Sequence, residues 1–155
     1  MLIGLISDTH GLMRPEALRA LDCVDMILHA GDVGGVRVLD QLRTIAPVRA
    51  VSGNTDILDA PELVAELDLV LDGVSVHVSH GHELGAPTPI GLVEHYDADV
   101  IVYGHTHQQM VAHVDGRLVV NPGAAGPRRF KLEPSVARLT IARGAAQVEV
   151  VPIEG

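Results

Sequence analysis

Short apolar runs, each ending in a polar loop that carries glycine, dominate the first third of the chain. The runs over 2–6, 25–30 and 47–51 have the length and aliphatic content of buried strands. Helices are expected between them over 15–21, where Pro15 suits a first turn, and over 36–42, where apolar residues recur at helical spacing. This alternation is typical of right-handed parallel crossovers, so the sequence predicts a parallel sheet here.

Paired strands are expected in the rest of the chain. Extended runs joined by two-residue turns predict three hairpins. They span 62–80, 110–120 and 135–152, with Asp72-Gly73, Asp115-Gly116 and Arg143-Gly144 at their turns. A short helix near 90–96 and a strand over 99–103 separate the first two hairpins. The predicted architecture is an α/β sandwich whose first part is parallel.

Composition limits the function classes that need to be considered. With 155 residues, 47% of them hydrophobic, the chain suits one globular domain over 1–155. The net charge of −9 argues against tight binding to nucleic acid or an anionic membrane, because both need clustered Lys and Arg. Cys23 is the single cysteine, and the apolar run over 2–6 is too short for a membrane span or a signal sequence. A cytoplasmic protein without internal disulfides is therefore expected.

Metal-ligating residue types recur where the predicted strands end. Because open α/β sheets bind ligands at the carboxyl ends of their strands, side chains from five segments could converge at one edge. These side chains are Asp8, His10, Asp32, Asn54, His80, His105 and His107. Oxygen and imidazole donors suit divalent first-row metals, and the lack of thiolates among them excludes a Cys-rich structural zinc site.

Each of these motifs has an ordinary structural alternative when taken alone. The pairs Gly31-Asp32 and Gly53-Asn54 are common turn sequences. A single loop histidine is more often hydrogen-bonded than bound to a metal. The ordered set, one motif at each of five predicted strand ends, is what favours a shared metal site.

The ordered set also resembles a known family. The series Asp8-x-His10, Gly31-Asp32, Gly53-Asn54, His80-Gly81 and Gly104-His105-Thr106-His107 resembles the signature of the calcineurin-like metallophosphoesterases. The short chain, the Thr55-Asp56 that follows Asn54, and the segment 121–123 are similar to a small bacterial and archaeal phosphodiesterase branch. That branch also resembles a retromer subunit that serves as a scaffold. Over about 2–128, the resemblance implies a four-layer α/β/β/α sandwich of two mixed sheets flanked by helices.

The resemblance implies a dinuclear metal centre with one shared carboxylate. Asp8, His10 and His107 would hold the first ion, Asn54, His80 and His105 the second, and Asp32 would bridge both. Mn²⁺ is the first expectation, and Ni²⁺, Fe²⁺, Co²⁺ or Zn²⁺ are alternatives that sequence cannot rank. The implied reaction is hydrolysis of a small phosphate ester, preferentially a diester, by in-line attack of a metal-bridging hydroxide. Asp32 and Asn54 would thus take part in catalysis as well as in binding.

One position departs from the larger members of the superfamily. They carry a histidine directly after the Asn, where it protonates the leaving group, whereas this chain has Thr55. A threonine cannot act as an acid near neutral pH. His82, the spare imidazole nearest in sequence to a predicted ligand, is one candidate for the acid, and a supporting or surface role is its ordinary alternative. If no group replaces the histidine, esters with good leaving groups are favoured.

Three neighbouring features have expectations of their own. Asp56 is expected to orient a metal ligand through a hydrogen bond. His29 is expected to be buried and hydrogen-bonded near the site without binding metal. The segment 121–123 either closes the site or forms a simple turn.

Other functions stay open beside the enzyme. A protein-binding scaffold of the same fold with little or no activity is the main alternative, although no predicted ligand is lost here. A nuclease would require Arg14, Arg37, Arg128 and Arg129 to cluster at the site. Exposed hairpin edges leave a homo-oligomer open.

Overall fold

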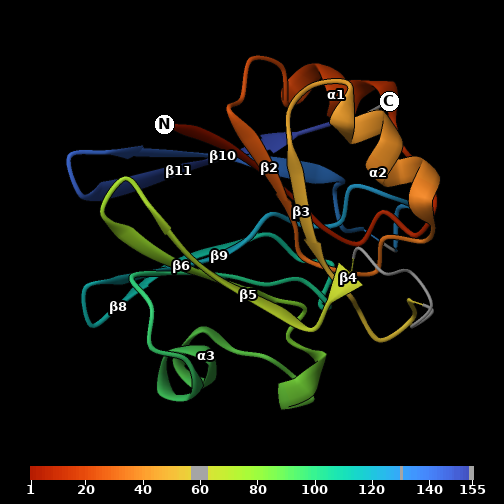
Figure 1. Ribbon diagram of the computed structural model, residues 1–155. Helices are drawn as coiled ribbons and strands as arrows, with labels where there is room; N and C mark the ends of the chain where they lie inside the picture. The colour runs from red at the N-terminus through yellow and green to blue at the C-terminus, as the bar shows by residue number, and fades with distance from the viewer. Residues whose placement is uncertain (57–62, 130, 154–155) are drawn as a thin grey trace.

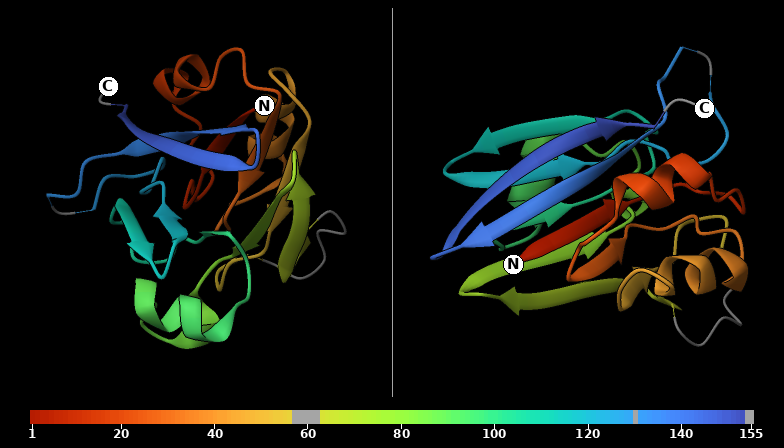
Figure 2. Two further views of the ribbon diagram at one scale, coloured as in Figure 1. Left: turned by 90° about the vertical axis from the view of Figure 1, so that its left-hand side faces the viewer. Right: turned by 90° about the horizontal axis from the view of Figure 1, so that it is seen from above.

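The computed structural model describes residues 1–56, 63–129 and 131–153. Two β-sheets pack face to face, and helices cover their outer faces (Figure 1; Figure 2). Both sheets contain parallel and antiparallel neighbours. The expected four-layer sandwich of two mixed sheets is confirmed.

The first sheet has six strands in the order β11-β10-β1-β2-β3-β4. They are β1 (Leu2–Ile6), β2 (Met26–His29), β3 (Val48–Val51), β4 (Leu63–Val64), β10 (Ser135–Ala142) and β11 (Ala145–Pro152). The helices α1 (Pro15–Ala20) and α2 (Val36–Arg43) connect β1 to β2 and β2 to β3. These three strands are parallel, so the crossovers predicted from the alternating pattern are present.

The second sheet has five strands in the order β5-β6-β7-β9-β8. They are β5 (Glu66–Leu71), β6 (Val74–Ser79), β7 (Val100–Val102), β8 (Met110–Val114) and β9 (Arg117–Asn121). A single 3-10 turn, η1 (His82–Leu84), and the helix α3 (Pro89–His95) lie between β6 and β7. Thr88 caps α3 by accepting a hydrogen bond from the Gly91 amide, and Pro89 occupies its first turn.

All three hairpins predicted from two-residue turns are present. Both central residues of each turn have positive φ angles, for example 48° and 82° at Asp72-Gly73 and 51° and 77° at Asp115-Gly116. That is the backbone of a type I′ turn, whose twist matches the flanking strands. The turn residues therefore determine the register of the hairpins.

The prediction of one continuous strand over 62–71 is wrong. Residues Leu63 and Val64 form β4, which pairs with β3 in the first sheet, whereas β5 begins at Glu66 in the second sheet. The chain passes from one sheet to the other at Ala65, and residue 62 lies outside the described residues. One apolar run thus contributes strands to both sheets. The residues before and after Ala65 have the same strand propensity, so propensity alone does not reveal where the chain changes sheet.

A continuous aliphatic core lies between the two sheets. Ile3 and Leu5 of β1 face Val76 and Val78 of β6, and all four side chains are almost completely buried. A second cluster packs beneath α1 and α2, and a third beneath α3. Burial of each such side chain contributes roughly 1.5–3 kcal/mol. Among the described residues, no helix is long and apolar enough to cross a membrane.

Candidate metal centre

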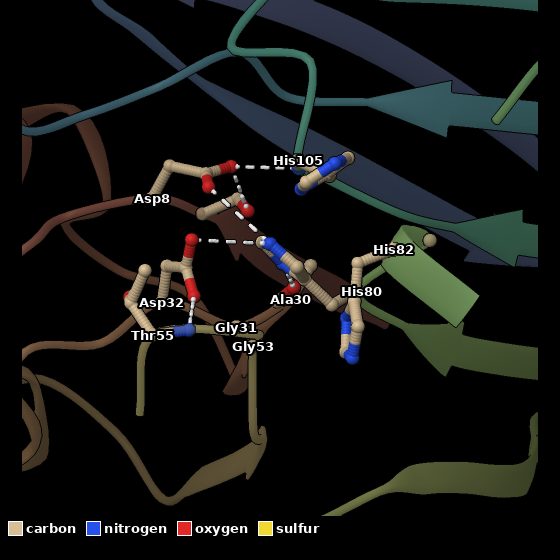
Figure 3. A network of polar contacts seen from close by, with 12 residues as sticks. Asp8, Ala30, Gly31, Asp32, Gly53, Thr55, His80, His82 and His105 are labelled. Atoms are coloured by element: carbon tan, nitrogen blue, oxygen red, sulfur yellow. Dashed lines mark hydrogen bonds and ion pairs between the residues drawn. The ribbon is translucent and has the colours of Figure 1, made fainter. Parts of the chain in front are cut away.

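Loops that follow five strands carry the predicted ligands to one end of the sandwich. These strands are β1, β2 and β3 of the first sheet and β6 and β7 of the second. Figure 3 shows Asp8, Asp32, His80 and His105 pointing toward one another from separate loops. The site is therefore shared between the two sheets, and residues far apart in the sequence meet there.

Two overlapping groups of potential ligands share Asp8. One contains Asp8, His10 and His107, and the other contains Asp8, Asp32 and His80. Asp8 Oδ1 lies 3.4 Å from His107 Nε2 and 3.7 Å from His80 Nε2. Asp32 Oδ2 lies 3.2 Å from His80 Nε2 and 3.7 Å from His10 Nε2. Two donors about 2.1 Å from one tetrahedral ion would be about 3.4 Å apart, so this spacing suits ligands that face a common ion.

Buried polar atoms in this cluster lack hydrogen-bond partners among the described residues. Asp8 Oδ1 and His80 Nε2 are both in this state. The contact between His80 Nε2 and Asp32 Oδ2 is short but is not aligned as a hydrogen bond. Leaving a buried polar group unpaired costs about 1–3 kcal/mol, and more for a charged group. A bound cation would supply the missing partner, so the residues present fit a metal ion.

The orientation of His80 is determined by a backbone carbonyl. Its Nδ1 donates a 2.8 Å hydrogen bond to the carbonyl oxygen of Ala30, so Nε2 faces the carboxylates. Such a bond selects the tautomer that can bind a metal. Burial lowers the pKa of His80, but the contact with Asp32 and the charge of Asp8 outweigh burial and raise it above its usual range.

Asp8 is held by two donors on one side. Its Oδ2 accepts hydrogen bonds from the Ser7 hydroxyl at 2.7 Å and from the His105 amide at 3.1 Å, which leaves Oδ1 directed at the histidines. Burial alone would raise the pKa of Asp8, and the contacts with His107 and His80 lower it below its usual range. Ser7 was not among the predicted site residues, although its place directly before Asp8 was a usable signal.

Asp32 is positioned by the loop after β3. Its Oδ1 accepts a 3.0 Å hydrogen bond from the Thr55 amide. Burial would raise the pKa of Asp32, but the contact with His80 and the Thr55 amide hold it well below its usual range. Asp32 therefore remains ionised at neutral pH.

Asp56 acts differently from the expectation. It accepts hydrogen bonds from the backbone amides of Val33, Gly34 and Gly53, so it contacts no ligand side chain. These bonds tie the loop after β3 to the loop after β2. Asp56 thus holds the backbone next to Asp32 and next to Asn54.

The remaining predicted site residues lie beside the two groups rather than inside them. The His105 ring is 5.2 Å from the His80 ring in an edge-on arrangement, and burial together with the charge of His80 lowers its pKa. Asn54 is exposed and directly precedes Thr55, whose amide contacts Asp32. The exposed His82 ring lies 5.3 Å from that of His80 and 6.2 Å from that of His105.

Strained backbone is concentrated at this site. Five predicted ligands have φ angles in the left-handed region, which costs an L-residue about 1–2 kcal/mol. They are Asp8 (53°), His10 (47°), Asp32 (54°), His105 (72°) and His107 (63°). Such strain persists only where the surrounding structure enforces it, and it is typical of functional sites.

Close approach of the loop after β7 requires a glycine. A Cβ atom at Gly104 would lie 2.0 Å from Ser7 Oγ and 2.7 Å from Asp8 Oδ2. Asn121 holds the same loop from β9, because its side-chain amide donates to the Gly104 carbonyl and to the Thr106 hydroxyl. The segment 121–123 is therefore more than a simple turn.

His29 has no free ring nitrogen. Its Nδ1 accepts a hydrogen bond from the Gly31 amide, and its Nε2 lies 3.0 Å from the Thr9 hydroxyl, which itself donates to the Val33 carbonyl. Burial lowers the pKa of His29 to about 4. The expectation that His29 is buried and hydrogen-bonded near the site is confirmed.

The four arginines considered for a nuclease have separate environments. Arg14 donates two hydrogen bonds to the Gly126 carbonyl, two residues before Arg128. Arg37, Arg128 and Arg129 are exposed. Among the described residues, no hydrogen bond or ion pair joins any of the four to a predicted ligand.

Comparison with known sequences identifies the family. Residues 1–144 match the calcineurin-like phosphoesterase superfamily domain. The chain is 34% identical over 163 residues to a probable metallophosphoesterase of Methanocaldococcus jannaschii, covering 99% of this chain and 82% of that protein. It is 30% identical over 144 residues to a phosphodiesterase of the same archaeon, covering 79% and 83%. The chain belongs to the calcineurin-like phosphoesterase superfamily, a class of metal-dependent phosphoesterases.

Solved structures agree with this assignment. Wild-type Vps29 of Entamoeba histolytica complexed with Zn²⁺ has a TM-score of 0.78 and 25% identity, covering 99% of this chain and all of that one. An archaeal phosphodiesterase has the same TM-score and identity, covering 97% and 100%. The resemblance indicated by the motifs is confirmed. The protein is similar both to an esterase and to a protein of the Vps29 type.

Proposed function

We propose that this chain is a dinuclear metal-dependent phosphodiesterase. The observation that carries the proposal is the arrangement of three imidazole nitrogens 3.2 to 3.8 Å from two carboxylates, with buried atoms left unpartnered. Histidine and carboxylate donors of this kind suit Mn²⁺ first, with Ni²⁺, Fe²⁺, Co²⁺ and Zn²⁺ as alternatives. The relative named as a phosphodiesterase supports the same interpretation.

The proposed ligand sets are those that the family resemblance implies. Asp8, His10 and His107, which lie together in the structure, would hold one ion. Asn54, His80 and His105 would hold the other, and Asp32 would bridge the two ions. Two bound divalent ions would lower the pKa of a water molecule and stabilise negative charge on the phosphoryl oxygens. The protein adds only two negative charges, from Asp8 and Asp32, so positive charge remains for an anionic ester.

Other residues of the chain would bind and orient the ester. Asn54 is exposed beside the cluster, and its side-chain NH₂ could donate a hydrogen bond to a phosphoryl oxygen. His82, exposed next to the His80 and His105 rings, could deliver a proton to the leaving oxygen. Asp32 would help to hold the ions that neutralise charge on the phosphoryl oxygens.

The charge of the substrate supports the proposed preference for diesters over monoesters. A phosphomonoester carries about two negative charges at neutral pH, whereas a diester carries one. Among the described residues, no hydrogen bond or ion pair joins an arginine or lysine to a predicted ligand, so no permanently charged side chain is held at the cluster to bind a dianion. The site is therefore better matched to the monoanionic diester.

The experiment compares hydrolysis of bis-p-nitrophenyl phosphate and p-nitrophenyl phosphate by metal-stripped protein given Mn²⁺, Ni²⁺, Zn²⁺ or Mg²⁺. We expect metal-dependent cleavage that is faster for the diester and is lost in Asp32→Asn and His105→Ala. The matched controls Asp115→Asn and His113→Ala change exposed residues of the hairpin between β8 and β9 and should keep the activity. Equal rates with and without metal would contradict the proposal.

The alternative is a scaffold of the same fold. The structural similarity to Vps29 is the observation that favours it. Folded protein that binds two equivalents of Mn²⁺ but cleaves neither ester would support the scaffold and overturn the enzyme.

A further inference from the structure

The carboxylate of Glu83 joins helix α3 to the loop that follows β6. Its Oε2 accepts a 2.6 Å hydrogen bond from the Tyr96 hydroxyl, directly after α3. Its Oε1 accepts a 3.0 Å hydrogen bond from the Gly81 amide. Both oxygens are therefore engaged, one on a helix end and one on the backbone between His80 and His82.

Tyr96 is itself held firmly against the second sheet. Its ring stacks on that of His77 with centroids 3.7 Å apart and planes 24° apart. The buried His77 is held in turn by Asp68, whose Oδ1 lies 2.8 Å from Nδ1. Arg117 of β9 donates a 2.7 Å hydrogen bond to the Tyr96 carbonyl. The contacts with His77 and Arg117 therefore fix the position of the Tyr96 hydroxyl that donates to Glu83.

The charge states of the pair match this arrangement. Burial raises the pKa of Tyr96, and the bond to Glu83 raises it further, well above its usual range. Burial raises the pKa of Glu83, but the Tyr96 hydroxyl and the other hydrogen bonds to the carboxylate, including that from the Gly81 amide, together outweigh burial and lower it. A neutral tyrosine therefore donates to an ionised glutamate, which is the stronger kind of hydrogen bond.

The loop that Glu83 holds is a single 3-10 turn in which His82 is exposed and Leu84 is half-buried. Gly81 has a φ of 99°, and the turn closes through bonds from the Leu84 amide to the Gly81 carbonyl and from the Gly85 amide to the His82 carbonyl. His82 Nδ1 lies 3.9 Å from Glu83 Oε1, too far for a hydrogen bond. The position of the His82 ring beside the His80 and His105 rings is therefore set by the loop backbone.

We propose that Glu83 and Tyr96 are positioning residues that hold the His82 imidazole beside the metal centre. This inference rests on the proposed function, in which His82 protonates the leaving group. As the P–O bond to the leaving group breaks, its electron pair takes the proton from the His82 imidazolium. The ring is then neutral and regains a proton from solvent. Neither Glu83 nor Tyr96 touches the ester in this scheme.

The test compares two esters that differ in leaving group. Bis-p-nitrophenyl phosphate releases p-nitrophenolate, which needs no proton, whereas diphenyl phosphate releases the more basic phenolate. Tyr96→Phe keeps the stacked ring and removes only the hydroxyl. We expect it to lower kcat on diphenyl phosphate about tenfold, part of the 10²–10⁴ available from acid catalysis, and to change kcat on the nitrophenyl ester less than about twofold. The exposed Glu94→Gln on α3 is the matched control for Glu83→Gln.

A second variant separates positioning from general structural support. In a His82→Gln background, Tyr96→Phe should cause no further loss, because the group it positions is gone. Equal losses on both esters, or an undiminished effect of Tyr96→Phe without His82, would overturn the inference and leave the proposed function intact. If the parent protein cleaves neither ester with any metal, the proposed function fails and the inference fails with it.

A third measurement needs no activity. The chain has two tyrosines and no tryptophan, so ultraviolet titration of the metal-free protein reports on Tyr96 and Tyr103 alone. Glu83→Gln should move one tyrosine ionisation to lower pH, and Glu94→Gln should move none. An unchanged titration in Glu83→Gln would show that the pair does not form in solution and would overturn the inference.

Discussion

The side-chain amide of Asn121 donates a 3.1 Å hydrogen bond to the carbonyl oxygen of Gly104. The same amide donates to the Thr106 hydroxyl at 3.0 Å, so the last residue of β9 holds the residues on either side of the predicted ligand His105. Asn121 is fully buried, and its Oδ1 accepts from the Gly123 amide. Both hydrogen bonds that its side-chain NH₂ donates therefore hold the loop after β7.

Asn121→Asp tests the hydrogen bonds that Asn121 donates, because the two side chains have nearly the same size. The carboxylate retains the acceptor for Gly123 but loses both donors and faces the Gly104 carbonyl. We expect a loss of about 1–3 kcal/mol in the free energy of unfolding. We also expect metal affinity to fall about 10–100-fold, as measured by calorimetric titration with Mn²⁺. The exposed Gln147→Glu makes the same amide-to-acid change on β11 and should alter neither quantity.

Metal binding should stabilise the folded chain. Mn²⁺ at a hundred times its Kd should add about 2.7 kcal/mol per independent site, seen as a rise in Tm that a chelator reverses. Asp8→Asn should abolish the part of this rise that comes from the ion held by Asp8, His10 and His107. Asp115→Asn, a change that suits the left-handed backbone at that turn, should retain it. A Tm of Asp8→Asn that still rises fully with Mn²⁺ would argue against metal binding at this cluster.

The buried His29 should make the metal-free protein sensitive to mild acid. Its folded pKa of about 4 lies below the ordinary value of about 6.5, so the unfolded chain binds more protons between these values. The stability contribution is complete above about pH 6.5 and is lost as the pH falls toward 4, by about 3 kcal/mol. His29→Gln can keep an acceptor for Gly31 and a donor for Thr9 but does not titrate there. The free energy of unfolding, measured in urea from pH 7 to pH 4, should fall less steeply in His29→Gln than in the parent or in the exposed His113→Gln.

Gly104→Ala should damage the site more than a glycine change elsewhere. The new Cβ would overlap Ser7 Oγ and crowd Asp8, so the loop after β7 must move away from the cluster. We expect loss of Mn²⁺ binding together with a fall of several kcal/mol in the free energy of unfolding. At Gly144 the space is open, and only the φ of 75° opposes a side chain, so Gly144→Ala should cost about 1 kcal/mol and keep metal binding. Similar losses in both variants would contradict this account.

Much of the fold follows from local patterns in the sequence. The turns at Asp72-Gly73 and Asp115-Gly116 have the left-handed backbone that Asp-Gly favours, and Gly144 suits the same backbone after Arg143, so the hairpins could be predicted. The break at Ala65 could not, because the choice between two sheets depends on which neighbour strand is available rather than on the propensity of Leu63 or Leu67.

The candidate site, like the fold, is only partly predictable from local sequence patterns. Spacing at strand ends was enough to bring Asp8 and Asp32 together, because the carboxyl ends of the parallel strands β1 and β2 share an edge. His80 follows β6 of the second sheet, so its place beside them depends on how the two sheets pack. The contacts that orient these side chains are non-local. The bond between Tyr96 and Glu83 joins residues 13 apart, and that between Asn121 and Gly104 joins residues 17 apart. No periodicity marks such pairs, so they emerge only from the packed chain.

The left-handed backbone of five predicted ligands has a consequence for protein engineering. At Asp8, His10, Asp32, His105 and His107, glycine would relieve the steric conflict between the side chain and its own backbone. A screen that selects for heat resistance alone, in the absence of metal, should therefore enrich glycine at these positions while discarding the chemistry. Selection for turnover would oppose every such change. Positions at which selection for heat resistance enriches glycine and selection for turnover removes it would identify the residues of the site, whichever ester the protein cleaves.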